Sequence, residues 1–310
     1  MRLVSFRRGP QDGPEGRVGV LDDDGRVVEV PNPAGGAWTM REYLQAWPVS
    51  QAMAAGAFEL RGTTHALSDI ELLAPVPRPT SVRDFYAFEA HVKRARLKRG
   101  MEVPPEWYEM PIFYYSNHCA VIGPEAPVVR PLGCEELDYE LEVACVIGRG
   151  GRNLTPDAAE AGIAGFTILN DWSARDIQRA EMKVGLGPAK GKDFATSLGP
   201  WLVTQDELAE RAAGLGRYDL AMTVRVNGER TGGGTLRDLH WRWGEMIARA
   251  SQNCGVWPGD VIGSGCVGTG CQLEQEPPRW MQAGDVVELE VERLGVLRNP
   301  VVESAGVRRA

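Results

Sequence analysis

The chain has 310 residues, of which 43% are hydrophobic and 25% are charged, and its formal net charge is −8. This composition is ordinary for a globular protein in water, and the negative charge, without a dense run of Lys or Arg, argues against nucleic acid or an anionic membrane surface as the main partner. No apolar run approaches membrane-spanning length, and residues 1–8 lack the apolar core of a signal peptide. We therefore expect a cytoplasmic location.

Residues 1–74 predict a small leading unit rich in β-strands. Its predicted elements are three short strands and one helix, at residues 3–6, 17–21, 26–30 and 40–55. Three prolines follow (Pro75, Pro77 and Pro79), and they favour a stiff, extended segment. We predict a β-rich N-terminal domain at 1–74 and a larger domain at 75–310.

The larger unit opens with a strand that carries Asp84, followed by a helix that carries His91. Residues 97–111 contain one glycine and three prolines, which predicts an irregular loop. A loop of this length in a compact domain is often a lid or a binding loop. An aromatic strand is expected next, at 112–115.

Residues 137–148 predict a strand on which Glu140 and Glu142 point to the same face. The residues that follow (143–147) are apolar on both faces, so we expect this strand to be buried. Two buried carboxylates without a partner would be costly, and a divalent metal with oxygen ligands would hold them together. The alternative is an edge strand with two solvated glutamates.

A short apolar strand at 166–169 leads into the run Asn170–Gln178. If this run is helical from Trp172 onward, Asp171, Arg175 and Gln178 share one face. The alternative is a solvated helix face with a single Asp–Arg pair. The last third alternates strands and turns around one helix at 239–253, and the many glycines and prolines fit short strands joined by tight turns.

Four separated segments together resemble the fumarylacetoacetate hydrolase family. They are Asp84-Phe85-Tyr86 with His91, residues 138–142, residues 170–178, and residues 191–194 ahead of Gly199-Pro200-Trp201. The resemblance covers residues 75 to 300, and the run at 170–178 is its most specific part. It implies an α+β fold, mainly β with some α, arranged as a mixed β-sandwich roll that is commonly a homodimer.

The resemblance also implies a site. A divalent metal (Mg²⁺, Ca²⁺ or Mn²⁺) would take four oxygen ligands, namely Asp84, Glu140, Glu142 and Asp171. His91 would be the general base and Glu274 the carboxylate that orients it. The implied polar groups at the reacting bond are Arg175, Gln178 and Lys192, and the implied substrate contacts are Tyr86 and Tyr114.

The activity that this resemblance implies is metal-dependent hydrolysis of a C–C bond in a 1,3-diketone or an acylpyruvate-type acid. Such a bond breaks when water adds to a carbonyl and the departing carbon leaves as an enolate. An imidazole base, fixed oxyanion donors and a metal each serve one part of that reaction. The alternatives are an isomerase, decarboxylase or hydratase of a 2-oxo acid on the same fold, or a binding protein without turnover.

Three departures from the family pattern fall where a substrate is selected, and one of them is a smaller leading unit. Cys266 stands where the family typically has a threonine hydroxyl. The loop between His91 and Trp107 is shorter than in the animal enzymes, so the family's substrate-binding arginine is one of Arg94, Arg96 and Arg99.

Overall fold

The computed structural model describes residues 1–304 except 58, 60 and 61. The strands of this part are β1 (Arg2–Arg7), β2 (Arg17–Leu21), β3 (Arg26–Glu29), β4 (Thr64–Ala66), β5 (Glu71–Leu72), β6 (Val82–Phe85), β7 (Phe113–Ser116), β8 (Val121–Ile122), β9 (Val128–Val129), β10 (Leu137–Asp138), β11 (Leu141–Ile147), β12 (Gly151–Arg152), β13 (Ile163–Asp171), β14 (Ser173–Ala174), β15 (Thr196–Val203), β16 (Ala221–Val226), β17 (Glu229–Thr235), β18 (Gly255–Val256), β19 (Val261–Gly263), β20 (Val286–Val291) and β21 (Gly295–Val302). The α-helices are α1 (Met40–Gln45), α2 (Val49–Ala55), α3 (Glu89–Leu97), α4 (Glu106–Glu109), α5 (Pro156–Glu160), α6 (Arg175–Met182) and α7 (Trp243–Ser251). The expected class, mainly β with some α, is confirmed.

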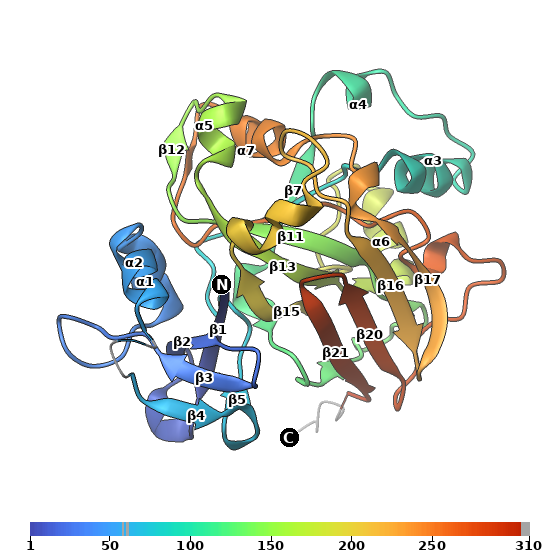
Figure 1. Ribbon diagram of the computed structural model, residues 1–310. Helices are drawn as coiled ribbons and strands as arrows, with labels where there is room; N and C mark the ends of the chain where they lie inside the picture. The colour runs from blue at the N-terminus through green and yellow to red at the C-terminus, as the bar shows by residue number, and fades with distance from the viewer. Residues whose placement is uncertain (58, 60–61, 305–310) are drawn as a thin grey trace.

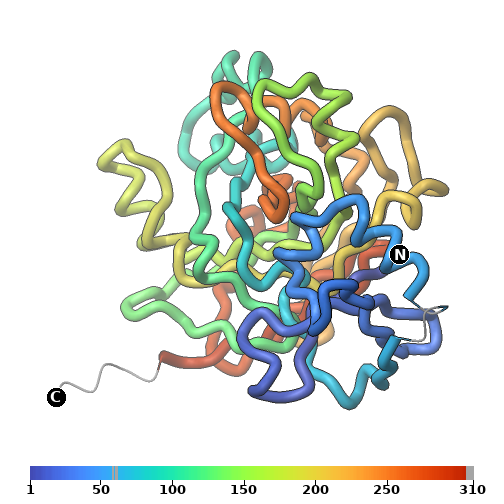
Figure 2. The backbone as a smooth tube through the Cα atoms, turned by 90° about the vertical axis from the view of Figure 1, so that its left-hand side faces the viewer, coloured from blue at the N-terminus to red at the C-terminus, as the bar shows by residue number. Residues whose placement is uncertain are grey.

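One large sheet runs through the molecule in the order β4-β3-β2-β1-β15-β13-β11-β19-β6-β7. The N-terminal strands join it because β1 pairs antiparallel with β15, with Arg2 opposite Val203. In Figure 1 and in the turned view of Figure 2, the blue N-terminal unit occupies one corner of the molecule. The division after residue 74 stays a prediction, and the two parts share a sheet.

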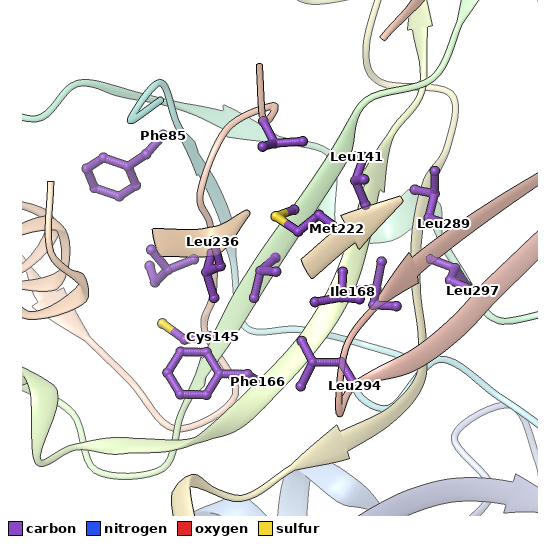
Figure 3. Close-up of a cluster of buried hydrophobic side chains, with 14 of the residues drawn as sticks. Phe85, Leu141, Cys145, Phe166, Ile168, Met222, Leu236, Leu289, Leu294 and Leu297 are labelled. Atoms are coloured by element: carbon purple, nitrogen blue, oxygen red, sulfur yellow. The ribbon is translucent and has the colours of Figure 1, made fainter. Parts of the chain in front are cut away.

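A second sheet, in the order β17-β16-β20-β21-β9, packs against one face of the first. Figure 3 shows the core between them, where Leu141 and Ile168 of the first sheet approach Met222 and Leu289 of the second. Apolar side chains on two facing sheets bury each other, which is the arrangement of a β-sandwich.

The strand β11 lies in the middle of the large sheet, between β13 and β19. All of its residues are buried. Val143 and Cys145 belong to the core against the second sheet, while Ala144 and Val146 belong to the core under the N-terminal unit. A strand covered on both faces is apolar throughout, so the alternative of an edge strand with solvated glutamates is wrong.

Three expected elements differ in detail. The helix at 40–55 is two helices, α1 and α2, because Pro48 between them cannot continue a helix. The strand at 137–148 is divided into β10 and β11. The helix expected from Trp172 begins only at Arg175, and Asp171 is the last residue of β13. The prediction that Asp171 lies on one helix face with Arg175 and Gln178 is therefore wrong.

The helices are short and lie around the sheets. In Figure 1 the teal helices α3 and α4 lie together at one end, and the loop expected at 97–111 carries α4. Across the described ranges, none of the helices has the length and apolar character needed to cross a membrane.

Candidate metal centre and active site

Four carboxylates gather at one end of neighbouring strands in the large sheet. Asp84 lies on β6, Glu142 on β11 and Asp171 at the end of β13, while Glu140 immediately precedes β11. One oxygen from each of the four lies within 4.8 Å of the others, and all four side chains are buried. The sheet order brings together residues that are up to 87 positions apart because β13, β11, β19 and β6 are successive strands.

A glycine leaves room for this cluster. Gly263 of β19 lies opposite Asp84 of β6 on one side and opposite Ala144 of β11 on the other. A Cβ atom at this position would lie 3.1 Å from Glu142 Oε2 and closer still to Asp84 Oδ1. The next glycine, Gly265, donates its backbone N–H to Glu142 Oε2 at 3.0 Å.

The charges of the cluster are not balanced by the protein alone. Burial, together with the neighbouring Asp84, raises the pKa of Glu142 well above its usual value. Burial also raises the pKa of Asp171 to about 7, although Lys192 opposes this shift. Glu140 behaves differently: burial would raise its pKa, but Lys192 and Arg175 lower it. A cation among the four oxygens would let all of them ionise.

The donor set fits a hard divalent cation. Within the described part of the chain, Glu142 Oε1 and Asp171 Oδ1 are buried without a hydrogen-bond partner. A buried carboxylate oxygen with no partner is costly. Mg²⁺, Mn²⁺ and Ca²⁺ take carboxylate oxygens as ligands, so an ion of this class would supply the missing interactions.

Two buried cations border the carboxylates. Lys192 Nζ donates to Glu140 Oε2 at 2.6 Å and also to Asp171 Oδ2. Arg175 Nη2 donates to Glu140 Oε1 at 2.7 Å, and its Nη1 donates to Gln178 Oε1 at 3.3 Å. These donors fix the position of Glu140 from two sides.

A base and a carboxylate form a pair beside the cluster. His91 of α3 is buried, and its Nδ1 is hydrogen-bonded to Glu274 Oε1. The other oxygen of Glu274 accepts from the Thr269 backbone N–H at 2.8 Å and from Arg94 Nη1 at 3.0 Å. Burial lowers the pKa of His91, but hydrogen bonds with Cys271 and Glu274 outweigh it and raise the pKa to about 10. His91 Nε2 lies 4.0 Å from Glu140 Oε1, so the imidazole faces the carboxylates.

A cavity of about 310 Å³ connects these groups. Tyr86, Tyr114 and Gln178 line it together with His91 and three of the carboxylates, those of Asp84, Glu140 and Glu142. Tyr114 donates its hydroxyl to Asp171 Oδ2. Arg96 and Arg99, at the end of α3, line the cavity too, whereas Arg94 contacts Glu274.

The eleven residues predicted for the site therefore converge, and their individual roles stay predictions. Sequence reasoning missed Asp138, which is fully buried. Its Oδ2 accepts from Arg175 Nε at 2.8 Å and from the Leu273 backbone N–H at 3.0 Å. The signal was present, since Asp138 precedes Glu140 by two residues as Glu140 precedes Glu142.

Comparisons with known proteins bear on the family of this chain. The family model described as fumarylacetoacetate (FAA) hydrolase C-terminal matches residues 80–302. A relative from Xenopus laevis, named oxaloacetate tautomerase fahd2, mitochondrial, is 32% identical over 307 residues, which cover 97% of this chain and 90% of the relative.

Two solved structures share the fold. A probable 2-hydroxyhepta-2,4-diene-1,7-dioate isomerase from Mycobacterium abscessus is 25% identical, with a TM-score of 0.74 over 98% of this chain and 99% of that one. A maleylpyruvate hydrolase from Sphingobium sp. SYK-6, solved with manganese(II) and pyruvate, is 23% identical, with a TM-score of 0.73 over 98% of this chain and 100% of that one. The likeness to the second structure speaks for the fold alone. With the family model covering most of its length, the chain belongs to the fumarylacetoacetate hydrolase family.

Proposed function

We propose that this protein is a divalent-cation-dependent tautomerase or isomerase of a 2-oxo acid, which moves a proton at the carbon next to the oxo group. The observation that carries the proposal is the His91–Glu274 pair. His91 lines the same cavity as Asp84, Glu140 and Glu142, and its Nε2 lies 4.0 Å from Glu140 Oε1. The name of the Xenopus relative supports this reaction over hydrolysis.

The carboxylates of the cluster (Asp84, Glu140, Glu142 and Asp171) would hold Mg²⁺, Mn²⁺ or Ca²⁺. Such an ion would supply positive charge that makes the C–H next to the oxo group of a 2-oxo acid more acidic.

His91 would take the proton from the carbon next to the oxo group and return it elsewhere on the same enol system. Glu274 fixes the imidazole tautomer and stabilises the imidazolium that forms. A base must be neutral to accept a proton, and a divalent cation beside Glu140 would lower the raised pKa of His91 because two positive charges repel. Gln178 and Tyr114, on the cavity wall, would contact the enolate oxygens.

The far end of the substrate would carry a second carboxylate. Arg96 and Arg99 line the cavity, while Arg94 is engaged by Glu274. Guanidinium groups recognise carboxylates through paired hydrogen bonds. We therefore propose a dicarboxylic 2-oxo acid as the substrate class, and Arg96 and Arg99 as the arginines that select it.

Hydrolytic C–C cleavage is the second candidate. The same His91–Glu274 pair favours it, because an imidazole that can deprotonate carbon can also activate water. A binding role without turnover is the third reading, and it would leave the metal bound but every substrate unchanged.

One assay distinguishes tautomerisation, C–C hydrolysis and binding without turnover. Purified protein with Mg²⁺ is given freshly dissolved enol oxaloacetate, and formation of the keto form is followed with malate dehydrogenase; acylpyruvates are tested in parallel for release of the free acid. We expect the tautomer to interconvert faster than in a Glu274→Gln control. Acid release from acylpyruvates without tautomerisation would replace the proposal with hydrolysis, and metal binding with neither activity would leave only the binding role.

A further inference from the structure

A second group of metal-binding side chains lies behind the proposed base. His91, Cys266, Cys271 and Glu274 each place one ligand atom within 4.8 Å of the others. Both thiols are buried, with Cys266 2% exposed and Cys271 fully enclosed. Tautomerisation and hydrolysis as described above use neither sulfur atom.

The backbone between the two cysteines is built to bring them together. Cys266 and Cys271 are five residues apart, and Thr269 between them has a φ of 67°, a left-handed conformation that is uncommon outside glycine. A Cβ atom at Gly270 would lie 3.1 Å from Cys266 Sγ, so the glycine leaves that sulfur its space. The tight loop therefore points both thiols toward one imidazole.

Apart from the hydrogen bond between Cys271 and His91, the thiols have weak partners. Cys266 Sγ contacts the Val267 carbonyl oxygen at 3.3 Å, and Cys271 Sγ lies 3.9 Å from Glu274 Oε1. Arg94 and the Thr269 N–H hold the other oxygen of Glu274, so Oε1 is the one directed at the group. Neither contact is strong enough to keep a sulfur from a metal ion.

Two thiols, one imidazole and one carboxylate are a zinc-type donor set. Tetrahedral zinc, with Zn–S near about 2.3 Å and Zn–N near about 2.0 Å, requires ligand atoms roughly 3–4 Å apart. The four ligand atoms lie within 4.8 Å of one another, and the 3.9 Å between Cys271 Sγ and Glu274 Oε1 meets this requirement. His91 and Glu274, which are hydrogen-bonded to each other, would have to move apart to bind the same ion. Mg²⁺ and Ca²⁺ prefer the all-oxygen cluster, so the two groups select different ions.

We propose that His91, Cys266, Cys271 and Glu274 form a site for a soft divalent ion such as Zn²⁺, and that its occupation switches the enzyme off. Each thiol releases its proton to solvent as its sulfur binds the ion. His91 and Cys266 line the cavity, which gives the ion a path. An ion that takes His91 and Glu274 removes the base from use, and this inhibitory part rests on the proposed function.

The test uses Co²⁺ as a coloured substitute for Zn²⁺ in the full-length, reduced protein with the oxygen cluster saturated by Mg²⁺. We expect a sulfur-to-cobalt charge-transfer absorption in the near ultraviolet that saturates at stoichiometric Co²⁺. It should weaken in Cys266→Ser and in Cys271→Ser and vanish in the double variant. The controls Cys119→Ser and Cys254→Ser, at exposed positions, should keep it.

The absorption reports the site whether or not a substrate is known, so it can succeed even if the proposed function fails. The proposed site would be refuted if the wild-type protein shows no such absorption while far-ultraviolet circular dichroism shows that it is folded. The two thiols would then serve only in packing. Loss of the absorption in the exposed-cysteine controls would overturn the site as well. With an active enzyme, the inhibitory Zn²⁺ concentration should rise at least about tenfold in Cys271→Ser, and unchanged inhibition would overturn the switch.

Discussion

At the scale of single residues, two side chains of the same type have pKa values shifted in opposite directions because their neighbours differ. Glu140 and Glu142 are two residues apart and both buried, yet the pKa of Glu142 is raised and that of Glu140 is lowered. Lys192 and Arg175 contact Glu140 directly, while Glu142 faces the carboxylate of Asp84. Glu140 is thus the anion of the cluster, and Glu142 requires a cation before it ionises.

Asp138 is expected to act as a positioning residue. Its carboxylate joins Arg175 to the backbone of the turn that carries Glu274. The Asp138→Asn substitution removes the negative charge that holds Arg175 and the turn in place. Turnover should therefore fall about 10- to 100-fold, as for other residues that orient the groups of a site without contacting the substrate. KM should change less, because Asp138 does not line the cavity.

The matched control for that variant is Glu136→Gln, two residues earlier. Glu136 pairs with Arg179 at the surface, and an exposed ion pair contributes little. The measurement is the turnover number and KM of both variants in steady-state kinetics. Full turnover in Asp138→Asn would show that Arg175 and Glu274 hold their places without it.

At the scale of elements, the site depends on β19, a strand that places no side chain among the proposed metal ligands. β19 separates β11 from β6 in the sheet, and Gly263 at its end lets carboxylates from both sides meet across it. The helix α3 contributes differently: His91 and Arg96 lie within it, Arg99 lies two residues beyond its end, and both arginines line the cavity. One helix and the turn that follows it thus carry the proposed base and the proposed substrate anchors.

Gly263→Ala should weaken metal binding. The added methyl group would overlap Asp84 Oδ1 and crowd Glu142 Oε2, so the two carboxylates must separate. We expect the Kd for Mn²⁺, measured by titration calorimetry, to rise at least about tenfold. The control is Gly9→Ala, where the methyl group meets only the flexible end of Gln11; equal affinities in all three proteins would refute the role of the glycine.

Arg99→Ala should discriminate between substrates. A charge-assisted hydrogen bond contributes about 1.5–3 kcal/mol, so KM for a dicarboxylic 2-oxo acid should rise about 10- to 100-fold. KM for the matching monocarboxylic acid should stay the same. Lys93→Ala is the control, because Lys93 lies on the helix that precedes Arg99 and pairs with half-buried Glu89. An equal effect on both acids would place Arg99 outside substrate recognition.

At the scale of the whole molecule, the metal cluster links folding to pH. The pKa values of Asp84, Glu142 and Asp171 are raised by burial first, and that of Asp171 reaches about 7. A carboxyl group with a raised pKa in the folded state binds its proton more tightly there than in the unfolded chain. Its stabilising contribution is therefore complete below the unfolded value of about 4 and is lost as the pH rises through the folded value.

With a chelator present, the free energy of unfolding should fall as the pH rises from about 4 to about 7, because of Asp171. Excess Mg²⁺ should offset this loss, so the increase in Tm that Mg²⁺ produces should grow with pH across the same window. Thermal melts at several pH values, with and without Mg²⁺, measure it. A Tm increment independent of pH would contradict the assigned cluster.

Many of the residues of the site could be predicted because they stand in short, specific runs of sequence. Their positions on strands and helices, and their contacts with distant segments, could not be predicted. Asp171 was expected on a helix face, whereas it ends β13 because it pairs with Thr196 of β15, a contact that local spacing does not reveal. Asp138 was overlooked because two of its partners, the N–H groups of Gln272 and Leu273, lie more than 130 residues away. Long-range pairing of strands and loops decided both cases.

The most direct measurement is exchange of the proton next to the oxo group of a 2-oxo acid in deuterated water, followed by NMR. With Mg²⁺ present, the wild-type protein should exchange that proton, and His91→Ala should be slower by about 10²- to 10⁴-fold while still binding Mn²⁺. Exchange that persists at the wild-type rate in His91→Ala, or after the divalent ions are chelated, would contradict the proposed pairing of an imidazole base with a carboxylate-bound cation.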